Sequence, residues 1–176
     1  LSGQAEDGFF TEKINSRLPG DIRILDAELV RNGFHARKSA VGKRYIYQLD
    51  LAEKPDVFTR RYTYHFPQQL DLEAMRKAAK LLTGTYEFAG YTDKKDEKST
   101  KRTIYAIMIC GQGSKVSIQY EGTGFLYHMV RILTGTLLEV GTGARSIESV
   151  KEPLKSKDRS QAGFLAPARG LFLDEV

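Results

Sequence analysis

Hydrophobic residues recur along the chain at spacings that change from helical to strand-like and back. Phe10, Ile14 and Leu18 repeat every four residues, which predicts a short helix over residues 9–18. The run IRILDAELV, residues 22–30, predicts a strand, and FHARKSA after it reads as a connection. The first part of the chain is therefore expected to hold one helix and one strand.

Two segments then alternate apolar and polar residues. GKRYIYQLDLA, residues 42–52, contains the strong strand formers Tyr45, Ile46 and Tyr47, and RYTYHF, residues 61–66, follows the same rule. Both predict strands, and the first should bury one face and leave the other available.

An apolar stripe of helical period comes next. Asp71 is in the position of a helix cap, and Gly84 is in the position of a stop. The stripe between them consists of Leu72, Met75, Ala79 and Leu82. This segment predicts an amphipathic helix that packs on a sheet.

The last part of the chain mixes both patterns. Residues 91–102 are dense in charge and predict a long exposed loop, whereas TIYAIMIC and SKVSIQYEG predict two strands joined by a turn at Gly111–Gly113. Helices over 125–138 and 146–154 and a final strand in GLFLDEV should follow. Short turns between neighbouring strands favour an α+β fold: an antiparallel or mixed β-sheet with helices packed on one face.

One arginine stands out from this pattern. Arg131 lies in the middle of the apolar helix 125–138, which has no acidic residue. A guanidinium cannot lose its charge, so we expect it to hold a specific anion. The alternative is that Arg131 extends along its own stem to the surface, or makes a structural ion pair with Glu121, Glu139 or Asp174. The pattern alone leaves the functional and the structural interpretation equal. His128, one turn earlier, could share the same cleft, although packing is the commoner role.

A second group of candidates lies on the strand 42–52. Lys43 and Tyr45 share one face, and Arg44 points to the other. A ring beside a cation suits RNA, because a base stacks on the ring while the cation meets a phosphate. Tyr47 shares the face of Tyr45, but a core position is the better interpretation for it. Lys101 and Arg102 extend the possible basic surface, although a solvated charged loop is the commoner explanation.

Composition narrows the function further. Lysine and arginine exceed aspartate and glutamate by 27 to 22, which is compatible with a nucleic-acid partner. The single cysteine excludes an internal disulfide framework, and without a signal-peptide pattern the expected location is the cytoplasm. No apolar run is long enough to span a bilayer, so no membrane partner is expected. Neither a zinc-ligand spacing nor a glycine-rich phosphate loop occurs, so we expect no metal and no cofactor.

The candidates fall in a recognisable order. FHAR with SAVGKRYIY, then EFAGYT, KRTI, GFLYHMVR and finally APARGLFL are distributed over nearly the whole chain. In this order they resemble the tRNA pseudouridine synthase A (TruA) family, and the match implies a pseudouridine synthase-like fold.

The resemblance also implies an activity. Family members break the bond between ribose C1′ and uracil N1, turn the base and rejoin it through C5, using an aspartate nucleophile and no metal or cofactor. By position, Arg131 is the arginine that pairs with this aspartate, and Tyr45 is the tyrosine that packs on the uridine. Arg44, Lys43, Arg102, Lys101, Phe125 and His128 are the expected substrate-binding neighbours. The implied substrate is a uridine in the anticodon stem-loop of tRNA, and the implied assembly is a homodimer.

One motif of the family does not occur in this sequence. The nucleophilic aspartate belongs to a run RTDxGVHA, and neither Asp7 nor Asp21 lies in such a run. We therefore interpret the chain as a C-terminal portion that binds but does not catalyse alone. Residues 1–33 would link it to a preceding domain, and residues 34–176 would form the domain with the tyrosine and the arginine. The alternatives are a non-catalytic RNA-binding module on the same scaffold and, less favoured, an interaction domain without RNA.

Overall fold

The computed structural model of the protein describes residues 10–36, 38–94 and 99–176. The chain divides into two compact units, Leu1–Ser39 and Ala40–Val176. The second unit holds the candidate residues for function. The predicted functional division between residues 33 and 34 stays a prediction.

In the first unit, the helical spacing is confirmed but the strand is not. Residues 10–15 are helical, whereas residues 22–30 form no strand. The Asn15 side chain bonds both backbone groups of Ile24, at 2.8 Å each, and Leu25 and Leu29 are almost fully exposed. The strand prediction was wrong because strand formers need a neighbouring strand for their backbone groups, and the described part of this unit offers none.

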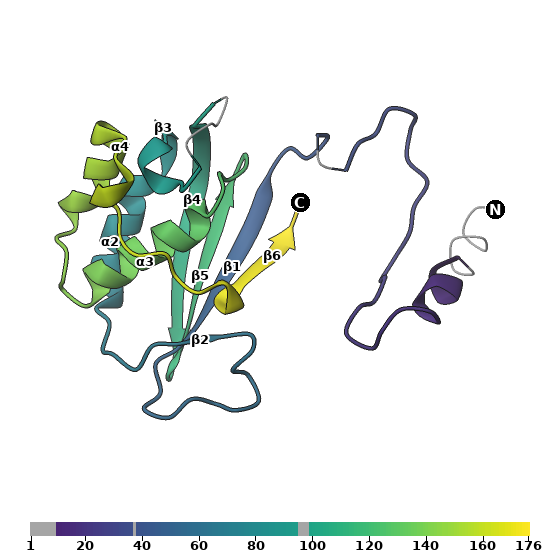
Figure 1. The fold of residues 1–176 in the computed structure, drawn as a ribbon, viewed down its shortest axis with the longest axis horizontal. Helices are drawn as coiled ribbons and strands as arrows, with labels where there is room; N and C mark the ends of the chain where they lie inside the picture. Colours follow the sequence, from purple (N-terminus) through teal and green to yellow (C-terminus); the bar gives the residue numbers. More distant parts are fainter. Residues whose placement is uncertain (1–9, 37, 95–98) are drawn as a thin grey trace. The chain divides into compact units, whose positions relative to one another are not determined.

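The second unit is built on a six-stranded sheet (Figure 1). Its strands are β1 (Lys43–Asp50), β2 (Tyr64–His65), β3 (Gly84–Glu87), β4 (Lys101–Gln112), β5 (Lys115–Gly122) and β6 (Leu171–Glu175). Their order is β2-β1-β5-β4-β3, and β6 also pairs with β1. Among the described strands, only the β1–β2 pair is parallel, so the sheet is mixed.

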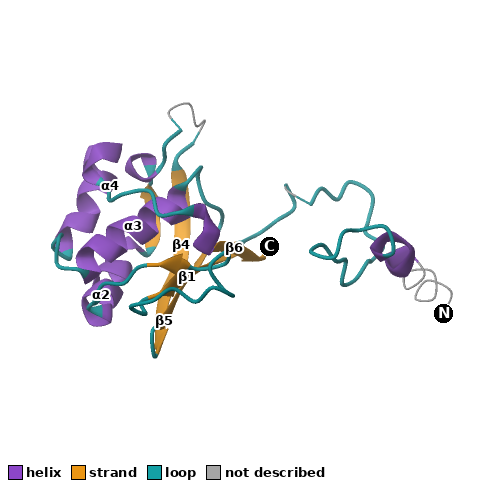
Figure 2. Cartoon of the chain, turned by 60° about the horizontal axis from the view of Figure 1, so that its bottom comes forward, coloured by secondary structure: helices purple, strands orange, loops and turns teal. Residues whose placement is uncertain are grey.

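The helices lie on one side of this sheet, as Figure 2 shows. They are α2 (Leu72–Leu82), α3 (Met129–Gly141) and α4 (Glu152–Ser156), with the short 3₁₀ turns η1 (Ala89–Tyr91), η2 (Glu148–Lys151), η3 (Arg159–Gln161) and η4 (Ala168–Gly170). The predicted α+β architecture is confirmed. The opposite face of the sheet exposes part of Met108 and the single cysteine, Cys110.

The capped helix forms as the pattern predicts. The Asp71 side chain accepts a hydrogen bond from the Ala74 N–H at 2.9 Å, and α2 buries Met75, Ala79 and Leu82. This cap satisfies one of the free N–H groups of the first turn, and the apolar stripe fixes the helix on the sheet.

Three other boundaries differ from the prediction. The strand expected over 61–66 shrinks to β2, because only its end reaches β1. Lys101 and Arg102 belong to β4 rather than to the charged loop, since they pair with Glu87 and Tyr86 of β3. The loop's Lys95 and Lys98 lie outside the described residues. Helix α3 starts four residues later than expected, because His128 adopts a left-handed conformation, with φ 62°.

Candidate functional site

Arg131 lies in the first turn of α3 and is held by a backbone group far away in the sequence. Its Nε–H donates to the Ala166 carbonyl at 2.5 Å, and its own carbonyl accepts from the Ala166 N–H at 3.2 Å. Among the described residues, Nη1 and Nη2 have no hydrogen bond or ion pair, and no buried side-chain nitrogen is left unsatisfied. The outer edge of the guanidinium is therefore open to solvent and available to an anion.

The carboxylates that could have neutralised Arg131 are bound elsewhere. Glu121 pairs with Arg44 at 2.8 Å, and Glu139 pairs with Arg145 at 2.9 Å. Asp174 also faces Arg44, at 3.6 Å. In the described part of the chain, the structural ion pair considered from the sequence is thus not formed.

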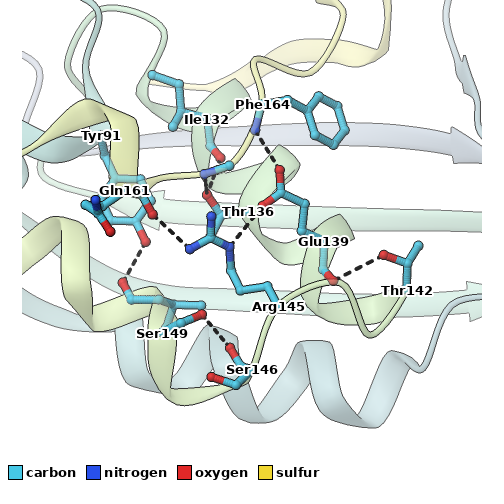
Figure 3. A network of polar contacts seen from close by, with 12 residues as sticks. Tyr91, Ile132, Thr136, Glu139, Thr142, Arg145, Ser146, Ser149, Gln161 and Phe164 are labelled. Carbon is cyan, nitrogen blue, oxygen red and sulfur yellow. Dashed lines mark hydrogen bonds and ion pairs between the residues drawn. The ribbon is translucent and has the colours of Figure 1, made fainter.

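Residues 158–167, here called the strap, run antiparallel to α3 and fasten Arg131 in place. The Gly163 N–H donates to Thr136 Oγ1 at 2.9 Å, and the Phe164 N–H donates to Glu139 Oε1 at 3.1 Å (Figure 3). The contact is close at Gly135, where a Cβ atom would meet the Phe164 carbonyl at 1.9 Å. A glycine at this point lets the strap lie directly on the helix backbone.

Tyr47 binds the strap from the sheet. Its hydroxyl donates to the Pro167 carbonyl at 2.6 Å, next to the carbonyl that holds Arg131. The ring is fully buried, and burial raises the pKa of the hydroxyl above its ordinary value, so it stays protonated. Tyr47 is a core residue, as the sequence favoured, and it connects β1 to the strap.

Tyr45 is two residues before Tyr47 on the same face of β1, about 7 Å along the strand. Its ring is partly buried and meets Phe125 edge-on, with centroids 5.3 Å apart. Burial raises the pKa of its hydroxyl. Two of the predicted residues, Tyr45 and Phe125, thus come together on the helix-covered face of the sheet.

His128 makes specific polar and aromatic contacts and is not merely packed in the core. Its Nδ1 lies 2.7 Å from Asp93 Oδ2, and its ring stacks on Tyr127 with centroids 3.8 Å apart. The other Asp93 oxygen accepts from Arg159 Nε at 2.8 Å. His128 is therefore engaged in a polar network at the start of α3.

Comparison with known proteins identifies the family. A sequence model described as tRNA pseudouridine synthase matches residues 78–176, which include α3, Arg131 and the strap. The chain belongs to this family. Members named tRNA pseudouridine synthase A from Geobacillus sp. (strain WCH70) and Bacillus subtilis (strain 168) are 44% and 45% identical to it over 164 residues. A third, from Clostridium kluyveri, is 41% identical over 164 residues.

The match covers the two proteins unequally. In the Geobacillus and Bacillus comparisons it spans 93% of this chain and 66% of the relative. The chain thus spans about two thirds of the length of these curated relatives. The resemblance inferred from the motifs is confirmed at the level of the family.

The remaining basic residues predicted from the family make no hydrogen bond to the residues that hold Arg131 in the described part of the chain. Arg44 faces the other side of β1, where it binds Glu121 at 2.8 Å and Glu175 at 2.6 Å. Lys43, at the start of β1, lines a hollow of about 260 Å³ together with Arg44 and Tyr105. Arg102 donates to the carbonyls of Ser99 and Lys101 in its own segment. Their predicted role in binding substrate stays a prediction.

Two other kinds of feature are absent from the described part of this family member. No cluster of acidic, histidine or cysteine side chains that could hold a metal ion occurs among residues 10–36, 38–94 and 99–176. Within the same ranges, no helix is both long and apolar enough to cross a membrane.

Sequence reasoning missed two parts of the site. The carbonyls of Ala166 and Pro167 hold Arg131 and Tyr47, but a backbone acceptor leaves no signal in the side-chain pattern. Asp93 was assigned to the exposed charged loop, although Thr92 and Asp93 directly follow Tyr91, the last residue of η1. The apolar residues just before Asp93 were the signal that this part of the loop is fixed to the core.

Proposed function

We propose that these residues belong to an enzyme that isomerises uridine to pseudouridine in the anticodon stem-loop of tRNA. Arg131 would hold the nucleophilic aspartate, which a segment outside the 176 residues supplies. The observation that carries this proposal is the state of Arg131: one nitrogen is fixed by Ala166, while the outer two have no partner among the described residues.

A guanidinium in this state suits the chemistry. Two parallel N–H groups can bind a carboxylate in a bidentate manner, which fixes its position and its orientation. The neighbouring positive charge favours the ionised form of the carboxyl group, and only the ionised form is a nucleophile. In the overall reaction the C1′–N1 bond is replaced by a C1′–C5 bond, C5 loses a proton and N1 gains one.

Tyr45 supports the proposal through its ring, which could stack on the target base. A uridine in a tRNA loop must leave its stack before it can react, and an aromatic ring offers it a new stacking surface. The edge contact with Phe125 and the partial burial of Tyr45 hold its ring in one orientation. A ring that is already fixed loses little entropy when the base binds.

The test is a pseudouridine assay on the full-length protein, with the 176-residue chain as its negative control. Arg131→Ala should lower kcat by about a hundredfold or more while tRNA affinity falls much less, because the arginine acts on the nucleophile. Arg76→Ala is the control for general damage, because this arginine of α2 bonds Glu73 and the Ile109 carbonyl rather than the strap. Equal losses of turnover and affinity in Arg131→Ala would contradict the assigned role.

The same assay separates the alternative function. A non-catalytic RNA-binding module would bind tRNA with a steep salt dependence but form no pseudouridine at any protein concentration. We further propose that the full-length protein is a homodimer in the cytoplasm, as the resemblance implies. Sedimentation of the full-length protein with and without tRNA would test the dimer.

A further inference from the structure

We propose that Asp93 is a positioning residue that sets the orientation of Arg131. This inference rests on the proposed function of Arg131 and adds a residue that acts on it without touching the substrate. It starts from the strained turn at His128, directly before α3.

His128 has a positive φ, which is uncommon for any residue with a side chain. Its carbonyl accepts the N–H of Ile132 at 3.0 Å, so its conformation sets the direction of the first turn of α3. That turn contains Arg131. A strained residue persists only where its surroundings fix it, and here the fixing group is Asp93, 2.7 Å from Nδ1.

Asp93 also fixes the strap. Its Oδ1 accepts from Arg159 Nε at 2.8 Å, and Arg159 Nη1 donates to the Gly163 carbonyl at 2.9 Å. Three residues later, the Ala166 carbonyl holds Arg131 Nε. One carboxylate therefore connects both parts that position Arg131: the start of its helix and the backbone segment that binds its side chain.

The element that carries Asp93 is itself well anchored. The preceding residue, Thr92, donates from Oγ1 to the Tyr127 carbonyl at 2.9 Å, and Tyr91 is buried with its hydroxyl on the Val150 carbonyl at 2.6 Å. Burial acts to raise the pKa of Asp93, but the hydrogen bonds from His128 and Arg159 outweigh it and hold the pKa below its ordinary value. Asp93 is thus a charged group on a fixed support at neutral pH.

The side chains of His128, Asp93 and Arg159 are 23%, 32% and 30% exposed. Ion pairs this exposed add little to global stability, because water and salt screen them. Their effect should appear in local geometry instead. Replacing Asp93 should leave the fold intact and loosen Arg131.

The chain contains a matched control on the same helix. Glu139 makes an equivalent connection at the far end of α3, since it pairs with Arg145 and accepts from the Phe164 N–H of the strap (Figure 3). Glu139→Gln removes one charge and the pairing with Arg145, whereas Asp93→Asn removes one charge and the pairings with both His128 and Arg159. Glu139→Gln does not touch the turn at His128.

The first measurement is hydrogen exchange of the Arg131 Nε–H in the full-length protein labelled with ¹⁵N-arginine, with the signal assigned by its loss in Arg131→Lys. Asp93→Asn should speed this exchange by about tenfold, because the hydrogen bond to Ala166 opens more often. Glu139→Gln disturbs one contact of the strap but not the turn at His128, so it should speed this exchange by much less than Asp93→Asn. Unchanged exchange in Asp93→Asn, or equal acceleration in both variants, would overturn the proposal.

The second measurement is a double-mutant cycle on kcat and KM. Asp93→Asn should lower kcat by about tenfold with little change in KM, since small displacements of a catalytic group reduce the rate of reaction more than binding. In an Arg131→Lys background the same substitution should have no further effect on kcat, because its effect passes through Arg131. Additive losses would show that Asp93 acts elsewhere. If the wild-type protein forms no pseudouridine, the proposed function fails, and the exchange measurement still decides the role of Asp93.

Discussion

At the scale of single residues, the arginines differ in whether a carboxylate already neutralises the guanidinium. Arg44, Arg145 and Arg159 each bind a carboxylate within 3 Å, whereas the outer nitrogens of Arg131 bind none among the residues that the structure describes. Identical side chains thus differ in how much of their charge is left for a ligand, because their surroundings differ. The carbonyl of Ala166 makes the difference at Arg131, because it fixes the side chain without neutralising its charge.

Tyr45 can be tested separately through its ring and its hydroxyl. The ring should stack on the target base, a contact worth about 1–3 kcal/mol per base. Tyr45→Phe keeps the ring and should retain most of kcat/KM, whereas Tyr45→Ala should reduce it by about tenfold or more. Pseudouridine formation under single-turnover conditions measures both.

The matched control for this pair is Tyr105→Ala, which removes an exposed ring from β4. Unchanged turnover in Tyr45→Ala would remove Tyr45 from the site. A loss in Tyr45→Phe as large as in Tyr45→Ala would assign the role to the hydroxyl instead.

Two residues of the candidate site could be selected from the sequence, and their roles stay predictions. Arg131 was conspicuous because it interrupts an apolar helix, and Tyr45 because it shares a strand face with a cation. The ligand of Arg131 could not be predicted, since Ala166 contributes only a backbone carbonyl 35 residues away. Asp93 could not be distinguished from its charged neighbours, because its role depends on contacts with His128 and Arg159.

At the scale of helices and strands, the spacing of apolar residues predicted whether a segment is a helix or a strand more reliably than where it begins and ends. Helix α2 forms as expected, because the Asp71 cap and the apolar stripe both predict it. The β4–β5 hairpin forms as expected because two strand patterns flank a turn signal. The strand predicted over 22–30 failed for lack of a neighbour, and β3 was missed because four residues carry almost no periodic signal. The start of α3 was displaced by the single left-handed residue His128.

The contact between α3 and the strap gives a prediction about stability. Gly135→Ala should improve helix propensity by about 1 kcal/mol. The added Cβ would, however, meet the Phe164 backbone oxygen at 1.9 Å, and backbone cannot move aside as a flexible side chain does. Overpacking of this kind costs about 1–3 kcal/mol, so we expect a net loss of stability in urea unfolding.

Gly20→Ala is a suitable control for this substitution, because a Cβ there would have no neighbour within 4 Å. A Gly135→Ala protein as stable as the wild type would mean that the strap does not lie on α3. The variant should also lose turnover, since a displaced strap moves the Ala166 carbonyl away from Arg131.

At the scale of the whole molecule, the sheet contains a buried charge. Asp50, at the end of β1, is 1% exposed and pairs with Lys115 of β5 at 2.9 Å. Burial acts to raise its pKa, but the Lys115 ammonium and the backbone N–H groups of Ala52 and Asp56 outweigh this and lower it. The pair connects β1 and β5 at the end of β1, where the loop that leads to β2 begins.

The direction of this shift predicts a pH dependence. A lowered pKa in the folded state stabilises the protein above the ordinary carboxyl pKa of about 4, and that contribution is lost as pH falls through the folded value. Asp50→Asn should therefore destabilise the protein at pH 7, and the difference from wild type should shrink towards pH 3. Urea unfolding at several pH values measures this.

Glu53→Gln, an exposed change of the same kind nearby, should give a difference that is small at every pH. A constant destabilisation by Asp50→Asn from pH 7 to pH 3 would mean that the Asp50 charge does not contribute.

The open face of the sheet has a practical consequence. Cys110 is the only cysteine of the chain, and its thiol is exposed on the side away from the helices. A fluorophore or spin label attached there would report on that face alone, on the side of the sheet opposite the helix that carries Arg131. If the chain is part of the longer enzyme proposed above, the reaction rate of this thiol in that enzyme, measured against a Cys110→Ser variant, would show whether the other residues cover this surface.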